Sequence, residues 1–331
     1  MREFYSSRLH VLFLAALSIV LSDAVFAQQK SPLNRRYIKG PVRVFFTDVG
    51  TSAVSPVDAD KTGVPDQVED VAKQIWAARE LFCKVLNFQD PIGCERYSRV
   101  NCVEVRLRNR KVLGKNGEAF ESAQRARSIP EGNKDDRALV MNVATSVVPS
   151  RNQTPAHEFF HLIQYGSTYF KNRWYLEGQA RWAEHALGTS GLGDVRYDAK
   201  GPWPQATPHL KQLVAMTYDA EFVLWNPIAK AADRNGILPR FSDELKTLKY
   251  SDGSLVVQDD LLNGHALMRE ILVELGRLDD IAYSRLNFKE WSEDNQRSQA
   301  NNPYIYEGIM NALRRQNPGV GRFSAATGAK P

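Results

Sequence analysis

Two histidines one helical turn apart, His157 and His161, constrain this chain more than any other feature. They follow Thr154 and Pro155, so we expect Thr154 to cap a helix and Pro155 to occupy its first turn. Both imidazoles then lie on one face of the helix. Two imidazoles in this relation can bind one tetrahedral Zn²⁺, and Glu158 is placed to take a proton from water at the metal's open position. The alternative is a helix with two surface histidines.

A second helical segment supports the metal interpretation. It covers residues 174–187, ends at Gly188, and offers Glu177 as a third ligand. The connection after His161 leaves room for the first helix to end and for the chain to return beside it. Glu184 recurs on the same helical face and can accept a hydrogen bond from the outer nitrogen of a ligand histidine. A solvated helix edge would also explain both glutamates, but apolar residues share that side. These neighbours are Leu176, Ala180, Ala183 and Leu187.

The two segments, His-Glu-Phe-Phe-His-Leu-Ile-Gln at 157–164 and Trp-Tyr-Leu-Glu-Gly-Gln-Ala-Arg-Trp-Ala-Glu at 174–184, resemble the gluzincin metallopeptidases. The resemblance is to the secreted bacterial metalloproteases first described from myxobacteria in particular, and it extends from the first strand to about residue 248. The spacing from His161 to Glu177 is shorter than in the better-known aminopeptidases of this group. By the resemblance, His157, His161 and Glu177 match the zinc ligands, Glu158 the general base and Glu184 the acid that supports a ligand.

The resemblance also implies a fold and an activity. We expect an α+β, zincin-like protein with an N-terminal twisted sheet over the motif helix, a mainly helical C-terminal part and a cleft between them. Substrate would enter along the sheet edge. We therefore expect a secreted zinc metallopeptidase that hydrolyses peptide bonds in peptide or protein substrates by a water that Glu158 activates at the zinc.

Attack on a carbonyl makes its oxygen negative, so such a site needs a second electrophile besides the metal. Tyr218, His209 and His265 are the candidates. Tyr218 opens the segment Tyr-Asp-Ala-Glu-Phe-Val-Leu-Trp, which resembles the tyrosine-headed helix that supplies this group in gluzincins, although a core aromatic explains it equally well. Histidines in positions like those of His209 and His265 are more often packed in the protein or exposed on a helix surface than catalytic.

Two other functions fit the same motif. One is an inactive zinc-binding module of zincin fold, but Glu158 argues against it because decayed peptidases usually lose the base or a ligand. The other is a zinc hydrolase that acts on esters or glycans, since the same activated water attacks any polarised carbonyl.

The N-terminus is typical of a secretory signal. Arg2 and Arg8 precede an apolar run, and Ala27 ends a small-residue cleavage site, so we expect removal of residues 1–27 and a secreted or periplasmic protein. No later stretch is long and apolar enough for a membrane helix, so we expect no membrane insertion after cleavage. The 43 basic and 38 acidic residues are interspersed without a Lys/Arg-dense run, so we expect no nucleic-acid binding.

Residues 28–150 are expected to form the sheet part of the catalytic domain. A long amphipathic helix is predicted at 66–86. The stretch 111–136 is rich in charge, glycine and serine and predicts a loop that carries an element of the substrate groove. Alternating β-formers predict strands at 42–46, 103–107 and 138–143.

Residues 151–317 are expected to form the zinc-binding, helical part, followed by a disordered tail at 318–331. Further helices are predicted at 208–235, 260–276 and 303–315.

Three cysteines lie in the mature chain, and an oxidising compartment favours a disulfide. Cys94 and Cys102 flank a short loop before a predicted strand, so we expect this pair to be bonded. Cys83 falls inside a helical pattern and is expected to be a buried thiol.

Residues 58–69, Asp-Ala-Asp-Lys-Thr-Gly-Val-Pro-Asp-Gln-Val-Glu, match the pattern of a calcium loop, with Gly63 at the sharp turn. Lys61 adds a positive charge and Pro65 stiffens the backbone, which count against a Ca²⁺ ion. The alternative is an acidic turn in which Asp66 caps the following helix. The oxygen ligands would come from Asp58, Asp60, Thr62, Asp66 and Glu69, with the carbonyl of Val64.

Overall fold

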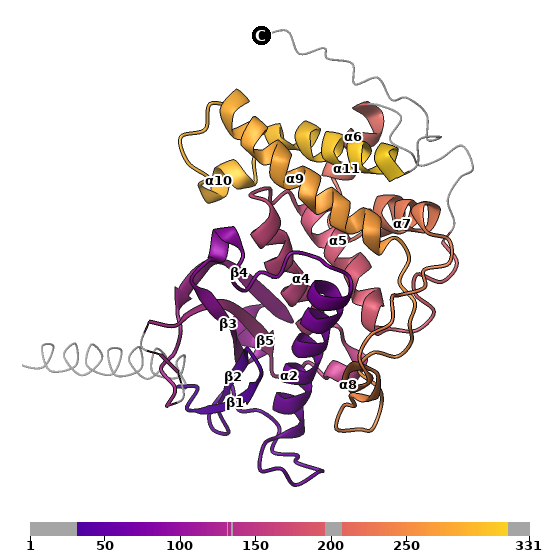
Figure 1. Ribbon diagram of the computed structural model, residues 1–331. Helices are drawn as coiled ribbons and strands as arrows, with labels where there is room; N and C mark the ends of the chain where they lie inside the picture. The colour runs from indigo at the N-terminus through magenta and orange to yellow at the C-terminus, as the bar shows by residue number, and fades with distance from the viewer. Residues whose placement is uncertain (1–31, 131, 134, 196–206, 317–331) are drawn as a thin grey trace, which may run out of the picture.

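A computed structural model shows an α+β protein in which a five-stranded mixed sheet lies against a layer of helices (Figure 1). It describes residues 32–130, 132–133, 135–195 and 207–316. The predicted α+β class is confirmed. The predicted signal sequence at 1–27 and the predicted tail at 318–331 lie outside the described residues.

The sheet has the strand order β1-β2-β3-β5-β4. Its three inner strands run parallel, and the two edge strands pair antiparallel with their neighbours. β2, β3 and β5 contain the three predicted strands, which are confirmed. The bounds are β1 Arg35–Lys39, β2 Val42–Phe46, β3 Val100–Arg108, β4 Gly117–Arg125 and β5 Arg137–Ala144.

The predicted loop at 111–136 is wrong, because it contains the edge strand β4, preceded by the short helix α3 (Arg110–Leu113). Most β4 side chains are only partly buried, so the strand has no alternation of apolar and polar residues that a sequence pattern could detect. Pairing with β5 holds it in place, with a register shift between Phe120 and Gln124. β1 was also not predicted. None of its side chains is buried, and its two apolar residues, Tyr37 and Ile38, are adjacent in sequence and face opposite sides of the strand.

The long helix predicted at 66–86 is confirmed as α2 (Asp66–Arg79), which continues as the π-helical turn η1 (Glu80–Val85). The two motif helices are α4 (Thr154–Ser167) and α5 (Arg173–Glu184), and α5 continues as the 3-10 turn η4 (His185–Leu187). Thr154 is the first helical residue and not the cap. Its backbone N–H bonds to Asn152 Oδ1 at 2.9 Å, so Asn152 satisfies the donor that a cap would serve.

The helix predicted at 208–235 is wrong as one element, because the structure divides it into α6 (Thr207–Val214), the π-helical turn η5 (Glu221–Trp225) and α7 (Asn226–Ala232). The helix predicted at 260–276 begins at His265 and continues to Arg285 as α9, and the helix predicted at 303–315 is confirmed as α11 (Asn302–Gln316). Short helical turns complete the described chain. They are η2 (Glu95–Tyr97), η3 (Pro149–Arg151), α8 (Asp243–Thr247), α10 (Glu293–Gln296) and η6 (Gln299–Asn301).

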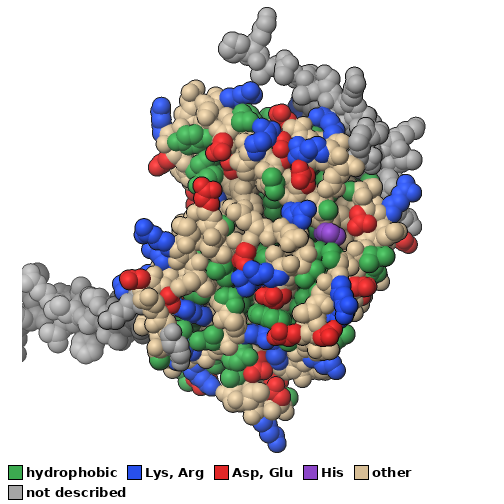
Figure 2. Space-filling model, in the orientation of Figure 1, with side chains coloured by type: hydrophobic (Ala, Val, Ile, Leu, Met, Phe, Trp, Pro, Cys, Tyr) green, Lys and Arg blue, Asp and Glu red, His purple; other side chains and the backbone are tan. Residues whose placement is uncertain are grey.

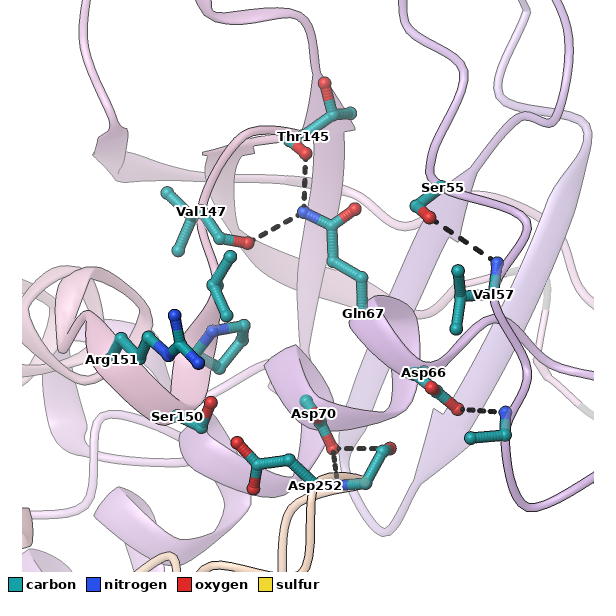
Figure 3. Close-up of a pocket in the computed structure, with 14 residues that line it drawn as sticks. Ser55, Val57, Asp66, Gln67, Asp70, Thr145, Val147, Ser150, Arg151 and Asp252 are labelled. Carbon is teal, nitrogen blue, oxygen red and sulfur yellow. Dashed lines mark hydrogen bonds between the residues drawn. The ribbon is translucent and has the colours of Figure 1, made fainter.

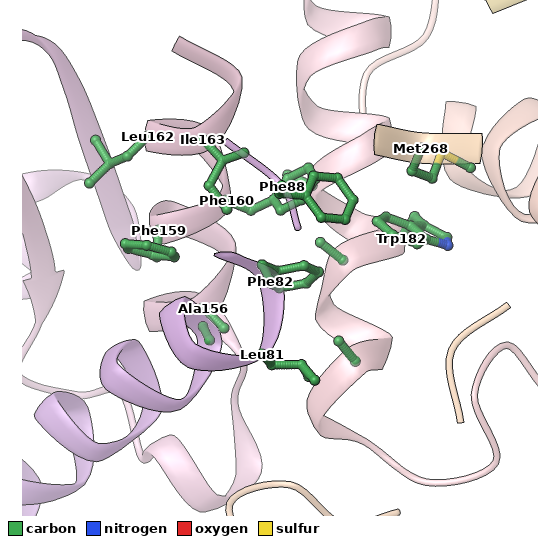
Figure 4. Packing of buried hydrophobic residues seen from close by; sticks show 14 of the residues in the cluster. Leu81, Phe82, Phe88, Ala156, Phe159, Phe160, Leu162, Ile163, Trp182 and Met268 are labelled. Carbon is green, nitrogen blue, oxygen red and sulfur yellow. The ribbon is translucent and has the colours of Figure 1, made fainter. Parts of the chain in front are cut away.

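An aromatic cluster fixes the motif helix inside the protein (Figure 4). Phe82 of η1 lies 5.1 Å, centroid to centroid, from Phe160 of α4, which lies 6.0 Å from Trp182 of α5. All three side chains are fully buried. Because Phe160 points into this cluster from between the two histidines of the motif, the cluster sets the rotation of α4 and the direction in which the histidine face points.

Candidate metal centre

The helices α4 and α5 bring His157, His161 and Glu177 together. Nε2 of His157 lies 3.3 Å from Glu177 Oε2, and Nε2 of His161 lies 3.6 Å from the same oxygen. One possible ligand atom from each side chain lies within 4.8 Å of the others, and both histidines are buried. The alternative of two surface histidines is therefore wrong, and the three predicted metal ligands converge on one point.

Glu184 holds the outer nitrogen of His157. Its Oε1 lies 2.7 Å from His157 Nδ1, and its Oε2 accepts a hydrogen bond from Arg181 at 2.6 Å. A carboxylate is only an acceptor, so Nδ1 of His157 carries a proton, and Nε2 is the ring atom that faces Glu177. Glu184 is therefore hydrogen-bonded to two protein partners, so the alternative of a solvated helix edge does not fit it.

Gln164 plays the same part for His161. Its Oε1 lies 2.8 Å from His161 Nδ1, and its Nε2 donates to the Leu176 carbonyl and to Gln179 Oε1, both at 3.0 Å. A backbone carbonyl can only accept, so the amide nitrogen must face Leu176 and the amide oxygen must face the histidine. Nδ1 of His161 is thus the donor to Gln164, and its Nε2 is the ring atom that faces Glu177. Sequence analysis missed Gln164 and Gln179, although both lie within the two motif segments.

The charges at this point favour a cation. Burial lowers the pKa of His157, but hydrogen bonds to Glu177 and Glu184 outweigh it and raise the pKa to about 10. Burial opposes ionisation of Glu177, yet hydrogen bonds from His157 and His161 bring its pKa well below the usual range. A proton on the histidine thus balances the carboxylate, and a divalent cation could supply the same charge. Two imidazole nitrogens and one carboxylate oxygen form a donor set that suits Zn²⁺ and leaves a coordination position open.

Glu158 is buried beside the two histidines, with 7% of its surface exposed. Burial raises the pKa of its carboxyl group, and the nearby His161 and His157 lower it in part. Gly117, the first residue of β4, makes room for it. A Cβ on Gly117 would lie 2.6 Å from Glu158 Oε1 and 2.5 Å from Thr154 Cγ2, so no larger residue fits without moving the glutamate. Sequence analysis missed Gly117 because the strand that carries it was not predicted.

Tyr218 lies at the rim of the same site. Its ring centroid is 6.3 Å from that of His157, and 48% of the residue is exposed, so the alternative of a core aromatic is wrong. Burial and the charge of Glu177 raise the pKa of its hydroxyl.

The other two candidates for the oxyanion role lie elsewhere. His209 of α6 packs its ring against Tyr306, at 6.2 Å between centroids, and both its ring nitrogens are buried without a partner. His265 begins α9 beside Asp233. Among the ring contacts and hydrogen bonds of the described residues, none connects either histidine to the convergent ligands.

The predicted Cys94–Cys102 disulfide is wrong, because both residues are buried free thiols, as is Cys83. Cys94 belongs to the core on the helical side of the sheet, where a Cβ on Gly166 of α4 would lie 3.4 Å from its Sγ. Cys102 precedes Val103, which faces that same core, so Cys102 points to the opposite side of β3, with its Sγ 3.7 Å from the Arg137 carbonyl. The sheet thus separates the two sulfur atoms.

The acidic loop brings together Asp58, Asp60 and Asp66, with one carboxylate oxygen of each within 4.8 Å of the others. Asp58 accepts hydrogen bonds from the backbone N–H groups of Thr62 at 3.0 Å and Gly63 at 2.9 Å. These bonds fold the loop around the three carboxylates. A Ca²⁺ ion at this place stays a prediction.

Two other predicted calcium ligands are engaged within the loop or away from it. Thr62 Oγ1 bonds to the Val64 carbonyl at 3.4 Å. Glu69 is 5% exposed and pairs with Lys73 at 3.3 Å, so its carboxylate is turned along the helix. The alternative reading of Asp66 as the N-cap is wrong, because Pro65 holds that position and Asp66 Oδ1 accepts from the Ala59 N–H at 2.9 Å.

A pocket of about 460 Å³ lies at the N-terminal end of α2 (Figure 3). Gln67 Nε2 donates to the carbonyls of Thr145 at 2.7 Å and Val147 at 2.8 Å, and Asp70 Oδ1 accepts from the backbone and hydroxyl of Ser251. The Gln67 bonds tie the segment before α4 to α2, and the Asp70 bonds tie the segment after α8 to the same helix. The pocket contains none of the convergent ligands and shares Ala59, Asp66 and Gln67 with the acidic loop.

Comparison with protein-family models, with curated proteins and with solved structures gives no match. Among the described helices, none is both long and apolar enough to cross a bilayer. On the face shown in Figure 2, basic and acidic side chains are interspersed.

Proposed function

We propose that this protein is a zinc-dependent hydrolase of zincin type and, more narrowly, a secreted or periplasmic peptidase. One observation carries the proposal. His157 and His161 both direct Nε2 toward the Glu177 carboxylate, while fixed acceptors hold Nδ1 of each. Structural histidine pairs have no need of rings held in this orientation, whereas metal ligands do. The secreted location rests on the N-terminal segment.

Zinc held by His157, His161 and Glu177 would polarise a substrate carbonyl and make water a better nucleophile at neutral pH. Glu158 takes the proton of the attacking water and returns it to the leaving amine, a task that suits a carboxylate whose pKa burial has raised. Tyr218, whose raised pKa keeps its hydroxyl protonated, donates a hydrogen bond to the carbonyl oxygen as that oxygen becomes negative.

The edge strand β4 favours a peptide as substrate. β4 is the last strand of the sheet, and it begins at Gly117 directly beside Glu158. Its backbone pairs with β5 on one side only, so an extended peptide can add to the other side and pass the candidate base. An ester or a glycan would make no use of this edge.

The test is Glu158→Gln. The amide fills the same space but cannot accept the proton, so we expect the variant to keep its fold and bound zinc and to lose nearly all turnover of an unbiased peptide library. Glu80→Gln, on η1, is the matched control and should keep full activity. Wild-type and both variants would also be assayed on ester and glycan substrates.

Two results would contradict the proposal. Full activity of Glu158→Gln would rule out Glu158 as the general base and, with it, the proposed hydrolase mechanism. If the zinc-loaded wild-type protein cleaves an ester or a glycan but no peptide, the protein is a hydrolase of another substrate class. If it cleaves none of these substrates, the protein is an inactive zinc-binding module.

A further inference from the structure

We propose that Glu221 is a positioning residue that holds the Tyr218 turn on α5 and thereby aims the Tyr218 hydroxyl at the metal centre. The inference rests on the proposed function, since Tyr218 acts in catalysis only if the site hydrolyses a carbonyl. Glu221 itself does not contact the convergent ligands.

The side chain of Glu221 is anchored to α5 and its continuation. It is 1% exposed, and its Oε2 accepts from Arg181 Nε at 3.2 Å. Its Oε1 lies 2.7 Å from His185 Nε2 and accepts from Asn226 at 3.1 Å. A buried carboxylate with these partners is fixed in place, because breaking these bonds would leave a desolvated charge without a partner.

The backbone of Glu221 is anchored to the Tyr218 turn. Its N–H donates to the Tyr218 carbonyl at 3.0 Å, and η5 begins at this residue. One residue therefore joins the turn to α5. Gly178, next to Glu177, lets the turn approach closely, because a Cβ there would lie 2.6 Å from the Trp225 ring and 2.9 Å from Ala220 Cβ.

Arg181 extends this connection to the metal centre. It bonds both Glu221 and Glu184, and Glu184 holds His157. The segment that carries Tyr218 and the support of one metal ligand thus share a single guanidinium. Loss of Glu221 would free the turn and leave Arg181 with Glu184 alone.

The rival explanation is that Glu221 stabilises the fold and nothing more. Glu274 of α9 provides the matched control. It is 5% exposed and bonds Arg277 at 2.7 Å, Arg315 at 3.2 Å and Asn311 at 3.1 Å, so it is also a buried carboxylate with arginine and asparagine partners. Glu274→Ala should cost stability without moving Tyr218.

The first experiment measures hydrogen exchange of residues 216–225 in the zinc-loaded protein. We expect Glu221→Ala to exchange this segment at least about tenfold faster than wild type, and Glu274→Ala to leave it unchanged. Glu221→Gln keeps one acceptor and should lie between, which provides a second variant should the alanine variant fail to fold. Unchanged exchange in the Glu221 variants would overturn the inference, whether or not the protein is an enzyme.

The second experiment is a double-mutant cycle with Tyr218→Phe on a cleaved peptide. Glu221→Ala should lower kcat about ten- to a hundredfold with KM within about threefold of wild type, since a misplaced hydroxyl weakens only the transition state. In the Tyr218→Phe background, adding Glu221→Ala should lower kcat by less than about a further twofold. Any effect of Glu274→Ala on kcat should instead be the same in both backgrounds. Equal losses in both backgrounds would overturn the role through Tyr218. A wild-type protein without turnover would refute the proposed function instead, and the exchange result would then decide whether Glu221 holds the turn.

Discussion

Glu177 and Glu184 lie on the same helix, and under the proposed function their contacts predict different effects on zinc affinity. Glu177 faces Nε2 of both histidines, so Glu177→Ala removes the proposed third ligand and leaves two nitrogens from one helix. Glu184 accepts from His157 Nδ1 and from Arg181. In Glu184→Gln, one of the two acceptor oxygens becomes a donor, so only one of these bonds can remain.

The expected size of the Glu184→Gln effect follows from the loss of one hydrogen bond. A lost partner of a ligand histidine typically weakens metal binding about ten- to a hundredfold. That factor corresponds to about 1.4–2.8 kcal/mol, which is the range for one hydrogen bond that involves a charged group. We therefore expect Glu184→Gln to keep zinc with a weaker affinity and Glu177→Ala to lose zinc on gel filtration.

The assay is a titration of each metal-free protein with Zn²⁺ in competition with a chromophoric chelator, with Glu274→Gln as a control remote from the site. The control should bind as wild type does. If Glu184→Ala lost its zinc while Glu177→Ala retained it, the ligand and its support would be reversed, and the assignment of Glu177 would be wrong.

Three further outcomes are expected. At constant zinc, Ca²⁺ at about 1 mM should raise the Tm of wild type and not of Asp60→Ala; equal midpoints of both proteins with Ca²⁺ and with a chelator would remove the site. Burial raises the pKa of Asp279 from 3.8 to about 6, so the folded state prefers the protonated acid and this stabilisation is lost as the pH rises through about 6. The free energy of unfolding of wild type relative to Asp279→Asn should therefore fall by up to about 3 kcal/mol between about pH 4 and pH 7, and parallel profiles would contradict this. Gly117→Ala should displace Glu158 and lower kcat at least about tenfold with zinc retained, whereas Gly166→Ala, where the nearest atom to a Cβ is 3.4 Å away, should not; full kcat in Gly117→Ala would refute the contact.

Sequence patterns predicted those strands and helices in which buried apolar residues form a continuous run or recur at the spacing of a helix. β2, β3 and β5 are apolar inner strands, and α2, α4 and α5 each bury a long stripe of apolar residues. β4 has no such period, because its place depends on pairing with β5. The chain from 208 to 235 has helical composition, but the helix is interrupted at residues 215–219, directly before the segment that packs at Gly178 and pairs with Arg181.

The candidate site was also predicted only in part from the sequence. Spacing along two helices was enough to select His157, His161 and Glu177, because α-helical geometry fixes which residues share a face. The Cys94–Cys102 disulfide was wrong, because closeness along the chain says nothing about which side of a sheet each sulfur occupies. Gly117 could be found only from the structure, since its contact with Glu158 joins two elements that lie far apart in sequence.

The motif on α4 supplies two imidazoles, but an imidazole has two nitrogens, and the motif does not determine which one is free. α5 determines it. The Leu176 carbonyl and Gln179 orient the Gln164 amide toward His161, and Glu184 holds His157, so the partners of both rings lie on or are fixed by the helix that carries Glu177. A change that moved α5 away from α4 would remove the proposed third ligand and release both histidine rings at once. The two helices therefore form one site only when packed together, which is why the second segment carries as much of the metal interpretation as the first.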